Sequence, residues 1–175
     1  LATNDGAGGN PLPTPPFLSA ADFSRSCAVH RSIGAVTAYA PASFSEPPPA
    51  AALADGIVLT GDLGQELARG RDSYLAVFAG LVRINTSPLL PLTAGEVEVT
   101  GLVPSADGVD FYWRVPVRVD QVLPLPLGVP SSVELSGRSA YTVDDGGRFT
   151  SHQLGDLRLA GRRLPSSTLA EFLGL

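Results

Sequence analysis

The clearest pattern in the chain is a strict alternation of apolar and mostly polar residues over positions 109–120. The apolar residues stand at every second position: Val109, Phe111, Trp113, Val115, Val117 and Val119. The residues between them are mostly polar: Asp110, Tyr112, Arg114, Arg118 and Asp120. Because side chains of a strand point alternately to its two faces, this pattern predicts a strand with one packed and one more polar face. Such a strand is typical of an antiparallel sheet that is covered on one side.

Patterns on either side of this strand predict two helices and further strands. Apolar residues recur at intervals of three and four in residues 19–40 and again in residues 71–85, as expected of helices with one buried face. These positions are Val29, Ile33, Val36 and Ala40 in the first helix, and Tyr74, Val77, Phe78 and Leu81 in the second. The other predicted elements are strands at residues 57–59, 96–102, 133–143 and 148–159, and a loop at residues 61–70.

The order helix, short strand, helix and then four strands in hairpins is typical of the α+β class. A curved antiparallel sheet that wraps the long N-terminal helix forms a cone with an internal pocket. The predicted boundaries are an extended arm rich in proline and glycine (1–18), the cone domain (19–160) and a C-terminal tail (161–175). Pro116 lies on the polar face of the long strand, where proline indicates a bulge, an edge or a bend.

Composition excludes several function classes. The formal net charge is −5, and a chain this acidic lacks the basic patch of a nucleic-acid-binding protein. Two histidines and the single Cys27 do not form a recognisable metal site, so we expect no metal and no cofactor. No window approaches 18 uninterrupted apolar residues, so no transmembrane helix is predicted. The absence of methionine leads us to expect a processed N-terminus.

The candidate pocket residues are aromatic, apart from one histidine. They are Tyr39, Tyr74, Phe78, Trp113, Tyr141 and His152. They either line a pocket for a hydrophobic ligand or form ordinary core. If His152 points into the cone and meets Asp62 or Asp156, it is a candidate general base; if it hydrogen-bonds across the sheet, its role is structural. His30 is predicted to be a partly buried helix residue. We assign no catalytic residue.

A separate signal comes from apolar segments that the predicted core does not use. They are the arm, the loop at residues 123–130 and the tail. Exposed apolar segments tend to mark interaction surfaces. The alternative is that these segments fold back over the mouth of the pocket. The residues expected to contact a partner are Pro11, Pro13, Phe17, Leu125, Leu127 and Phe172.

Three stretches carry a resemblance to a known family. They are residues 56–81 (GIVLTGDLGQELARGRDSYLAVFAGL), residues 111–117 (FYWRVPV) and residues 137–157 (GRSAYTVDDGGRFTSHQLGDL). Over residues 22–160 the chain resembles the nuclear-transport-factor-two-like or SnoaL-like cone fold. More narrowly, it is similar to an uncharacterised plant and algal family that is mostly plastid-targeted. That family pattern has an aspartate three residues after the histidine; here Gly155 takes that place and Asp156 follows it.

The resemblance implies a chloroplast protein, with its transit peptide removed, in the stroma or on the thylakoid surface. Together with the arm, the loop and the tail, it leads us to expect a non-catalytic accessory or assembly subunit of a photosynthetic membrane complex. Its partners would be protein subunits. The sequence leaves open whether the protein lies at the periphery of a membrane and whether it forms a homodimer. The alternative is an enzyme or carrier for a small hydrophobic ligand, with His152 at the pocket.

Overall fold

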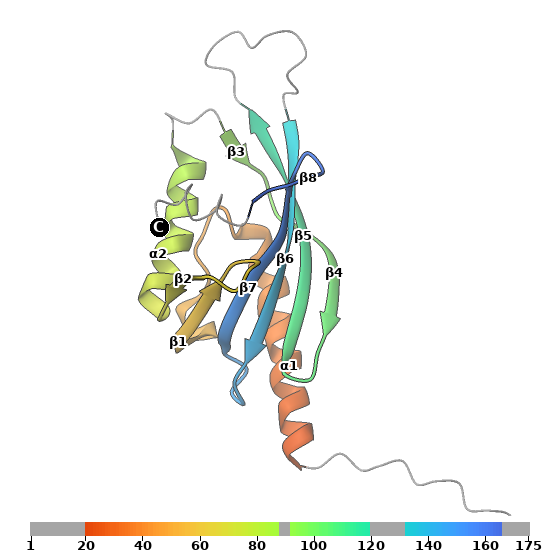
Figure 1. Cartoon of the computed structure of the whole chain (residues 1–175). Coiled ribbons are helices and arrows are strands. Elements are labelled where there is room, and N and C mark those ends of the chain that lie inside the picture. Colours follow the sequence, from red (N-terminus) through yellow and green to blue (C-terminus); the bar gives the residue numbers. More distant parts are fainter. Residues whose placement is uncertain (1–19, 88–91, 120–131, 166–175) are drawn as a thin grey trace, which may run out of the picture.

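The computed structural model describes residues 20–87, 92–119 and 132–165, in which a strongly curled sheet packs against two helices (Figure 1). The helices are α1 (Ala20–Tyr39) and α2 (Arg71–Thr86), with short 3-10 turns η1 (Ala40–Ala42) and η2 (Ala50–Ala52). The strands are β1 (Leu53–Thr60), β2 (Glu66–Arg69), β3 (Leu92–Ala94), β4 (Glu98–Pro104), β5 (Gly108–Val119), β6 (Ser132–Val143), β7 (Phe149–Leu159) and β8 (Arg162–Arg163).

The strands pair in the order β2-β1-β7-β6-β5-β3, with β4 also pairing with β5 and β8 with β7. All pairs are antiparallel except β1 and β7, which run parallel. The three long strands β5, β6 and β7 lie side by side and form the wall of a half-barrel (Figure 1). The long N-terminal helix and the antiparallel-rich sheet confirm the predicted α+β cone.

Strand β5 has the two faces that its sequence predicts. Val109, Phe111, Trp113 and Val115 are buried on the inner face. Pro116 pairs with Glu134 of β6 on one side, and on the other side the neighbouring strand breaks between β3 and β4. The register of the pairing with β5 shifts by one residue from β3 to β4. Pro116 therefore lies opposite an irregularity in the sheet, which is where proline, lacking a backbone N–H, is favoured.

Both helices turn their apolar stripes toward the inner face. Tyr74, Val77 and Phe78 of α2 are buried, as the spacing predicts. On α1, Val29 is buried but His30 is exposed, so the prediction of a partly buried His30 is wrong. The physical reason is helix geometry, because adjacent residues of a helix lie about 100° apart around its axis.

The other differences from the predicted elements are short strands. Residues 61–70, predicted as a loop, contain β2, and the tail contains β8. Strand β3 follows α2 and was not predicted. Each of these three strands has four residues or fewer, which is too short for an alternating pattern to stand out.

Candidate functional site

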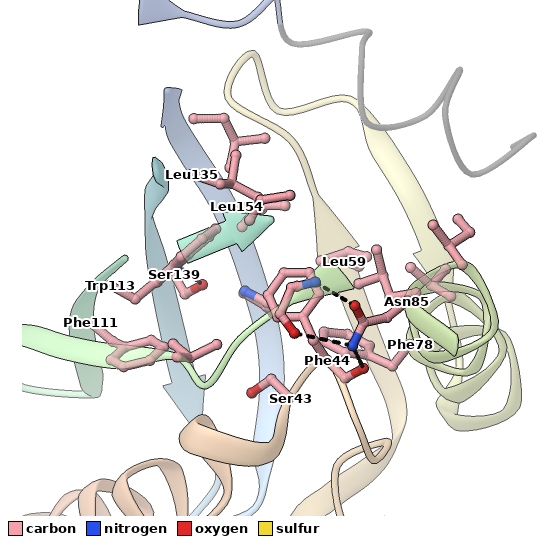
Figure 2. A pocket seen from close by; sticks show the side chains of 18 of the residues that line it. Ser43, Phe44, Leu59, Phe78, Asn85, Phe111, Trp113, Leu135, Ser139 and Leu154 are labelled. Atoms are coloured by element: carbon pink, nitrogen blue, oxygen red, sulfur yellow. Dashed lines mark hydrogen bonds between the residues drawn. The ribbon is translucent and has the colours of Figure 1, made fainter. Parts of the chain in front are cut away.

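A cavity of about 330 Å³ lies between the inner face of the sheet and the helices (Figure 2). Its size is at the lower end of the range usual for small-molecule sites. The lining residues are mostly aliphatic and aromatic. They are Tyr39, Ser43, Phe44, Leu59, Val77, Phe78, Leu81, Ile84, Asn85, Ala94, Val97, Phe111, Trp113, Val117, Leu135, Ser139, Tyr141, His152, Leu154, Leu157, Leu159 and Leu164.

The structure brings the six candidate pocket residues together. The five that line the cavity are Tyr39, Phe78, Trp113, Tyr141 and His152. Tyr74 does not line it, but it is fully buried and its hydroxyl lies 2.8 Å from Nδ1 of His152. Tyr74 therefore lies behind the wall, where it contacts the lining residues His152 and Phe78, the latter with ring centroids 4.9 Å apart.

His152 comes from β7, and its ring is held between aromatic side chains. It stacks on Tyr141 of the neighbouring strand with ring centroids 4.2 Å apart, and on Phe78 of α2 at 6.2 Å. Burial lowers the pKa of the imidazole to about 3, so the ring is neutral at physiological pH. Its other nitrogen, Nε2, is buried and has no hydrogen-bond partner in the described part of the chain.

The carboxylates considered as partners for this histidine are used elsewhere. Asp62 accepts a hydrogen bond from the backbone N–H of Asp156 at 2.9 Å and pairs with Arg163 at 3.0 Å. The side chain of Asp156 pairs with Arg158 at 3.1 Å. The hydrogen-bond partner of His152 is the hydroxyl of Tyr74, so the site lacks the His–Asp pair that the sequence left open.

A pair of tyrosine hydroxyls meets at the end of α1. The Tyr39 and Tyr141 oxygens lie 3.2 Å apart, and either hydroxyl can be the donor. Burial raises the pKa of Tyr39, and it raises the pKa of Tyr141 well above the usual value. Both phenols therefore remain protonated and uncharged at neutral pH.

Trp113 forms the wall of the cavity on β5. Its indole Nε1–H donates to Oγ of Ser139 on β6 at 3.2 Å. Gly137, the residue opposite Trp113 in the register, leaves room for the ring. A Cβ at that position would lie 2.7 Å from Cζ2 of Trp113 and 2.9 Å from Cδ2 of Leu157. The position of the indole thus depends on a glycine.

Asn85 of α2 is a cavity residue that the sequence analysis missed. Its amide donates to the carbonyls of Phe44 (3.0 Å) and Ala94 (3.4 Å), and its oxygen accepts from the backbone N–H of Ala94 (2.5 Å), as Figure 2 shows. These bonds join α2 to β3 and to the segment after α1. The sequence feature that could have revealed Asn85 is a polar residue four positions after Leu81, on a helix face that is otherwise apolar.

The remaining expectations concern partner-contact residues, metal sites and membrane-spanning helices. The six partner-contact candidates (Pro11, Pro13, Phe17, Leu125, Leu127 and Phe172) lie outside residues 20–87, 92–119 and 132–165. In those ranges no three His, Cys, Asp or Glu side chains gather as a metal site would require. None of the described helices is long and apolar enough to cross a membrane.

Comparison with known proteins identifies the fold. No family model and no curated protein matches the chain. Among solved structures, the "Putative SnoaL-like polyketide cyclase" of Jannaschia sp. CCS1 is similar, with a TM-score of 0.54 and 17% identity over 77% of this chain and 89% of that one. An uncharacterised Silicibacter pomeroyi protein with a cystatin-like fold has a TM-score of 0.50 and 15% identity, over 84% and 85%.

A third similar structure contains a ligand. It is Rv0760c of Mycobacterium tuberculosis in complex with estradiol-17beta-hemisuccinate, with a TM-score of 0.44 and 19% identity over 75% of this chain and 92% of that one. At these identities the likeness concerns the fold, and the chain has the nuclear-transport-factor-two-like, SnoaL-like cone fold.

Proposed function

We propose that this protein binds a small, uncharged, apolar molecule in the cone cavity and does not transform it chemically. The observation that carries the proposal is the composition of the wall. Of the 22 lining residues, all in the described part of the chain, none is Asp, Glu, Lys or Arg. An ionic ligand in this cavity would leave its charge unpaired away from water, at a cost of several kcal/mol.

The polar groups on the wall mostly bond to one another or to the backbone. Asn85 uses both ends of its amide, Ser43 donates to the carbonyl of Ala40 at 2.7 Å, and Tyr39 pairs with Tyr141. Groups already paired in this way leave an apolar surface for a ligand. Burial of apolar ligand surface would supply most of the binding free energy, at about 25 cal/mol per Å².

The electrostatics of His152 favour binding over catalysis. A general base works best when its pKa is near the operating pH. Burial lowers the pKa of His152 to about 3, and among the described residues no carboxylate forms a hydrogen bond or ion pair with the ring that would raise it. A neutral histidine of this kind abstracts protons weakly but still forms hydrogen bonds. The enzyme alternative would need a ligand that restores the basicity of His152.

The cavity can be tested with a fluorescent probe, because the chain contains one tryptophan and Trp113 lines the cavity. Titration with 1-aminoanthracene should give saturable quenching of Trp113 fluorescence with one site per chain. Val117→Phe fills the cavity and should weaken binding about tenfold or more.

The matched control is Val103→Phe, which makes the same change at a residue of β4 that is 54% exposed. It should leave binding unchanged. Binding that is equally strong in both variants would show that the probe sits elsewhere and would contradict the proposal. Circular dichroism and thermal unfolding of each variant establish that it is folded.

The chloroplast subunit hypothesis remains a separate proposal. It is supported by the sequence resemblance and by candidate contact residues that lie outside the described ranges. It predicts that the protein migrates with a large pigment–protein complex in gently solubilised plastid extract, and that deletion of residues 1–18 weakens this association. Migration as a free monomer or dimer would contradict it. The two proposals name different residues, and each has its own test.

A further inference from the structure

The cavity is closed at one end and open at the other, as the exposure of its lining residues shows. On β6, Ser139 is 3% exposed, whereas Leu135, nearer the start of the strand, is half-buried. On β7, His152 is 3% exposed, whereas Leu159, the last residue of the strand, is 39% exposed. Leu135 and Leu159 pair with each other, so the more exposed lining residues gather at one end of the half-barrel. We call this end the mouth of the cavity.

The short hairpin from β7 to β8 lies at the mouth (Figure 1). After Leu159 the chain turns back through Ala160 and Gly161, whose φ angles of 50° and 77° are typical of a two-residue hairpin turn. Arg162 pairs with Leu159, and two residues further on the side chain of Leu164 lines the cavity. Residues 160–164, which we call the strap, therefore supply part of the wall at the mouth.

Of the described parts of the mouth, the strap has the weakest attachment to the rest of the fold. Leu135 belongs to a strand of 12 residues with a neighbour on each side. The strap, in contrast, pairs with β7 at only two positions. Its further backbone bonds run from Leu164 to the carbonyl of Leu157 (2.7 Å) and from Ala160 to that of Glu134 (2.8 Å). Segments with few contacts open locally more often than the core does.

One carboxylate from a distant part of the chain fastens the strap. Oδ2 of Asp62, which follows β1, lies 3.0 Å from Nη2 of Arg163. Oδ1 of the same carboxylate accepts a hydrogen bond from the backbone N–H of Asp156 at 2.9 Å. Strand β1 pairs with β7 as far as Gln153, and β8 pairs with β7 from Arg158 onward. The carboxylate therefore bridges the gap that these two neighbours leave along one edge of β7.

The position of this carboxylate depends on Gly155, which lies within that gap. A Cβ at Gly155 would lie 2.2 Å from Oδ1 of Asp62, so a larger residue would displace the carboxylate. The side chain of Arg163 is 66% exposed, and an ion pair with so much access to water is weak. The link between Asp62 and Arg163 can therefore break and form again at little cost.

We propose, on the basis that the cavity binds an apolar molecule, that the strap is a gate for this molecule and that the ion pair between Asp62 and Arg163 is its latch. Opening of the strap withdraws Leu164 from the wall and widens the mouth. Neither Asp62 nor Arg163 lines the cavity, so the latch controls the rates of entry and exit and leaves the affinity unchanged. Because entry and exit use the same opening, both rates change by the same factor.

Stopped-flow measurements with 1-aminoanthracene, followed by the fluorescence of Trp113, give both rate constants. Arg163→Gln breaks the latch and should raise association and dissociation about twofold to fivefold, with an unchanged Kd. Asp62→Asn keeps an acceptor for the N–H of Asp156 and should have the same effect. The double variant should match the single variants, because all three break the same ion pair.

The matched control is Arg158→Gln, which breaks the 3.1 Å ion pair with Asp156 beside the strap but does not touch the latch. Its rate constants should equal those of the wild type. Added salt should speed probe exchange in the wild type and not in Arg163→Gln, because salt screens the latch. Amide hydrogen exchange at Leu164, whose N–H bonds to the carbonyl of Leu157, should be faster in Arg163→Gln by the same factor as the probe rates.

Three results would overturn the gate while leaving the proposed binding function standing. They are unchanged probe rates in both latch variants, an equal acceleration in Arg158→Gln, and a salt dependence that persists in Arg163→Gln. If 1-aminoanthracene does not bind to the wild-type protein at all, the proposed function and the gate both fail.

Discussion

Strand β5 presents two environments within one run of residues, one on each face of the sheet. Its inner face carries Phe111, Trp113 and Val115, all buried, and faces the cavity and core. Its outer face carries Asp110 and Arg114, which form ion pairs with neighbouring strands. The inner face of β5 carries no charged side chain, whereas the outer face carries charged side chains that remain close to water.

The two faces differ in how much a single side chain stabilises the fold. On the outer face, Arg114 pairs with Glu98 at 2.9 Å while both side chains are about half exposed. Such pairs typically contribute between 0 and about 1 kcal/mol. On the inner face, truncating a large buried side chain costs about 3–5 kcal/mol, because apolar contacts are lost and a void remains. Stability and ligand binding are therefore both expected to reside on the inner face.

The largest effect is expected at Phe149, which is 1% exposed and packs on Tyr141 with ring centroids 4.7 Å apart. Phe149→Ala should lower the free energy of unfolding by about 3–5 kcal/mol. Urea unfolding followed by circular dichroism measures this change. A loss below about 1 kcal/mol would mean that the inner face is no more tightly packed than the outer one.

The next largest effect is a pH dependence of the free energy of unfolding that arises from His152. Burial lowers the pKa of the folded histidine to about 3, against about 6.5 when unfolded, so between these values the unfolded state binds more protons. The stability from this group is present above pH 6.5 and is lost as the pH falls toward 3.

The double variant Tyr74→Phe/His152→Phe isolates this contribution. Between pH 7 and pH 4, the free energy of unfolding of the wild type should fall by about 3 kcal/mol more than that of the variant. Urea unfolding at several pH values measures it, since the carboxylates titrate alike in both proteins. A difference that stays constant with pH would show that His152 is solvated rather than buried.

A smaller effect is expected at Gly137, whose missing side chain leaves room for Trp113. Gly137→Ala should push the indole toward the cavity, lower the free energy of unfolding by about 1–3 kcal/mol and weaken probe binding. Gly101→Ala is the control, because its Cβ would make only ordinary contacts, 3.5 Å or more from Tyr112. Equal behaviour of the two variants would contradict the close packing of Trp113.

The smallest effect is expected from the outer face. Arg114→Ala should change the free energy of unfolding by less than about 1 kcal/mol and leave probe binding unchanged. Added salt should reduce even this difference, because exposed pairs are screened. A loss of binding in this variant would show that the outer face communicates with the cavity.

The same contrast explains what the sequence could and could not predict. The alternation in β5 and the helical spacing of Tyr74, Val77 and Phe78 follow from burial of one face, so the main elements and the cone were predictable. The short strand β2 was not predicted, since its pairing with β1 depends on a distant part of the sheet rather than on a local pattern.

For the candidate site, the sequence supplied candidate residues but no contacts between them. The aromatic positions could be placed on inward faces from periodicity alone. The bond between Tyr74 and His152 joins residues 78 positions apart, and no spacing rule indicates it. The sequence left open a carboxylate partner for His152 or a hydrogen bond across the sheet, and the fold instead supplies the phenol of Tyr74 on α2. Asn85 was missed because its bonds go to backbone atoms of other segments.

The most direct test of ligand binding at the inner face is a two-dimensional 1H–15N NMR titration with 9-fluorenone. The single tryptophan gives one indole signal, from the Nε1–H that donates to Ser139. We predict that this signal and the amides of Ser139 and Leu154 shift and saturate together, while the amides of Glu98 and Glu134 stay in place. Shifts confined to those outer residues, or none at saturating probe, would contradict the account.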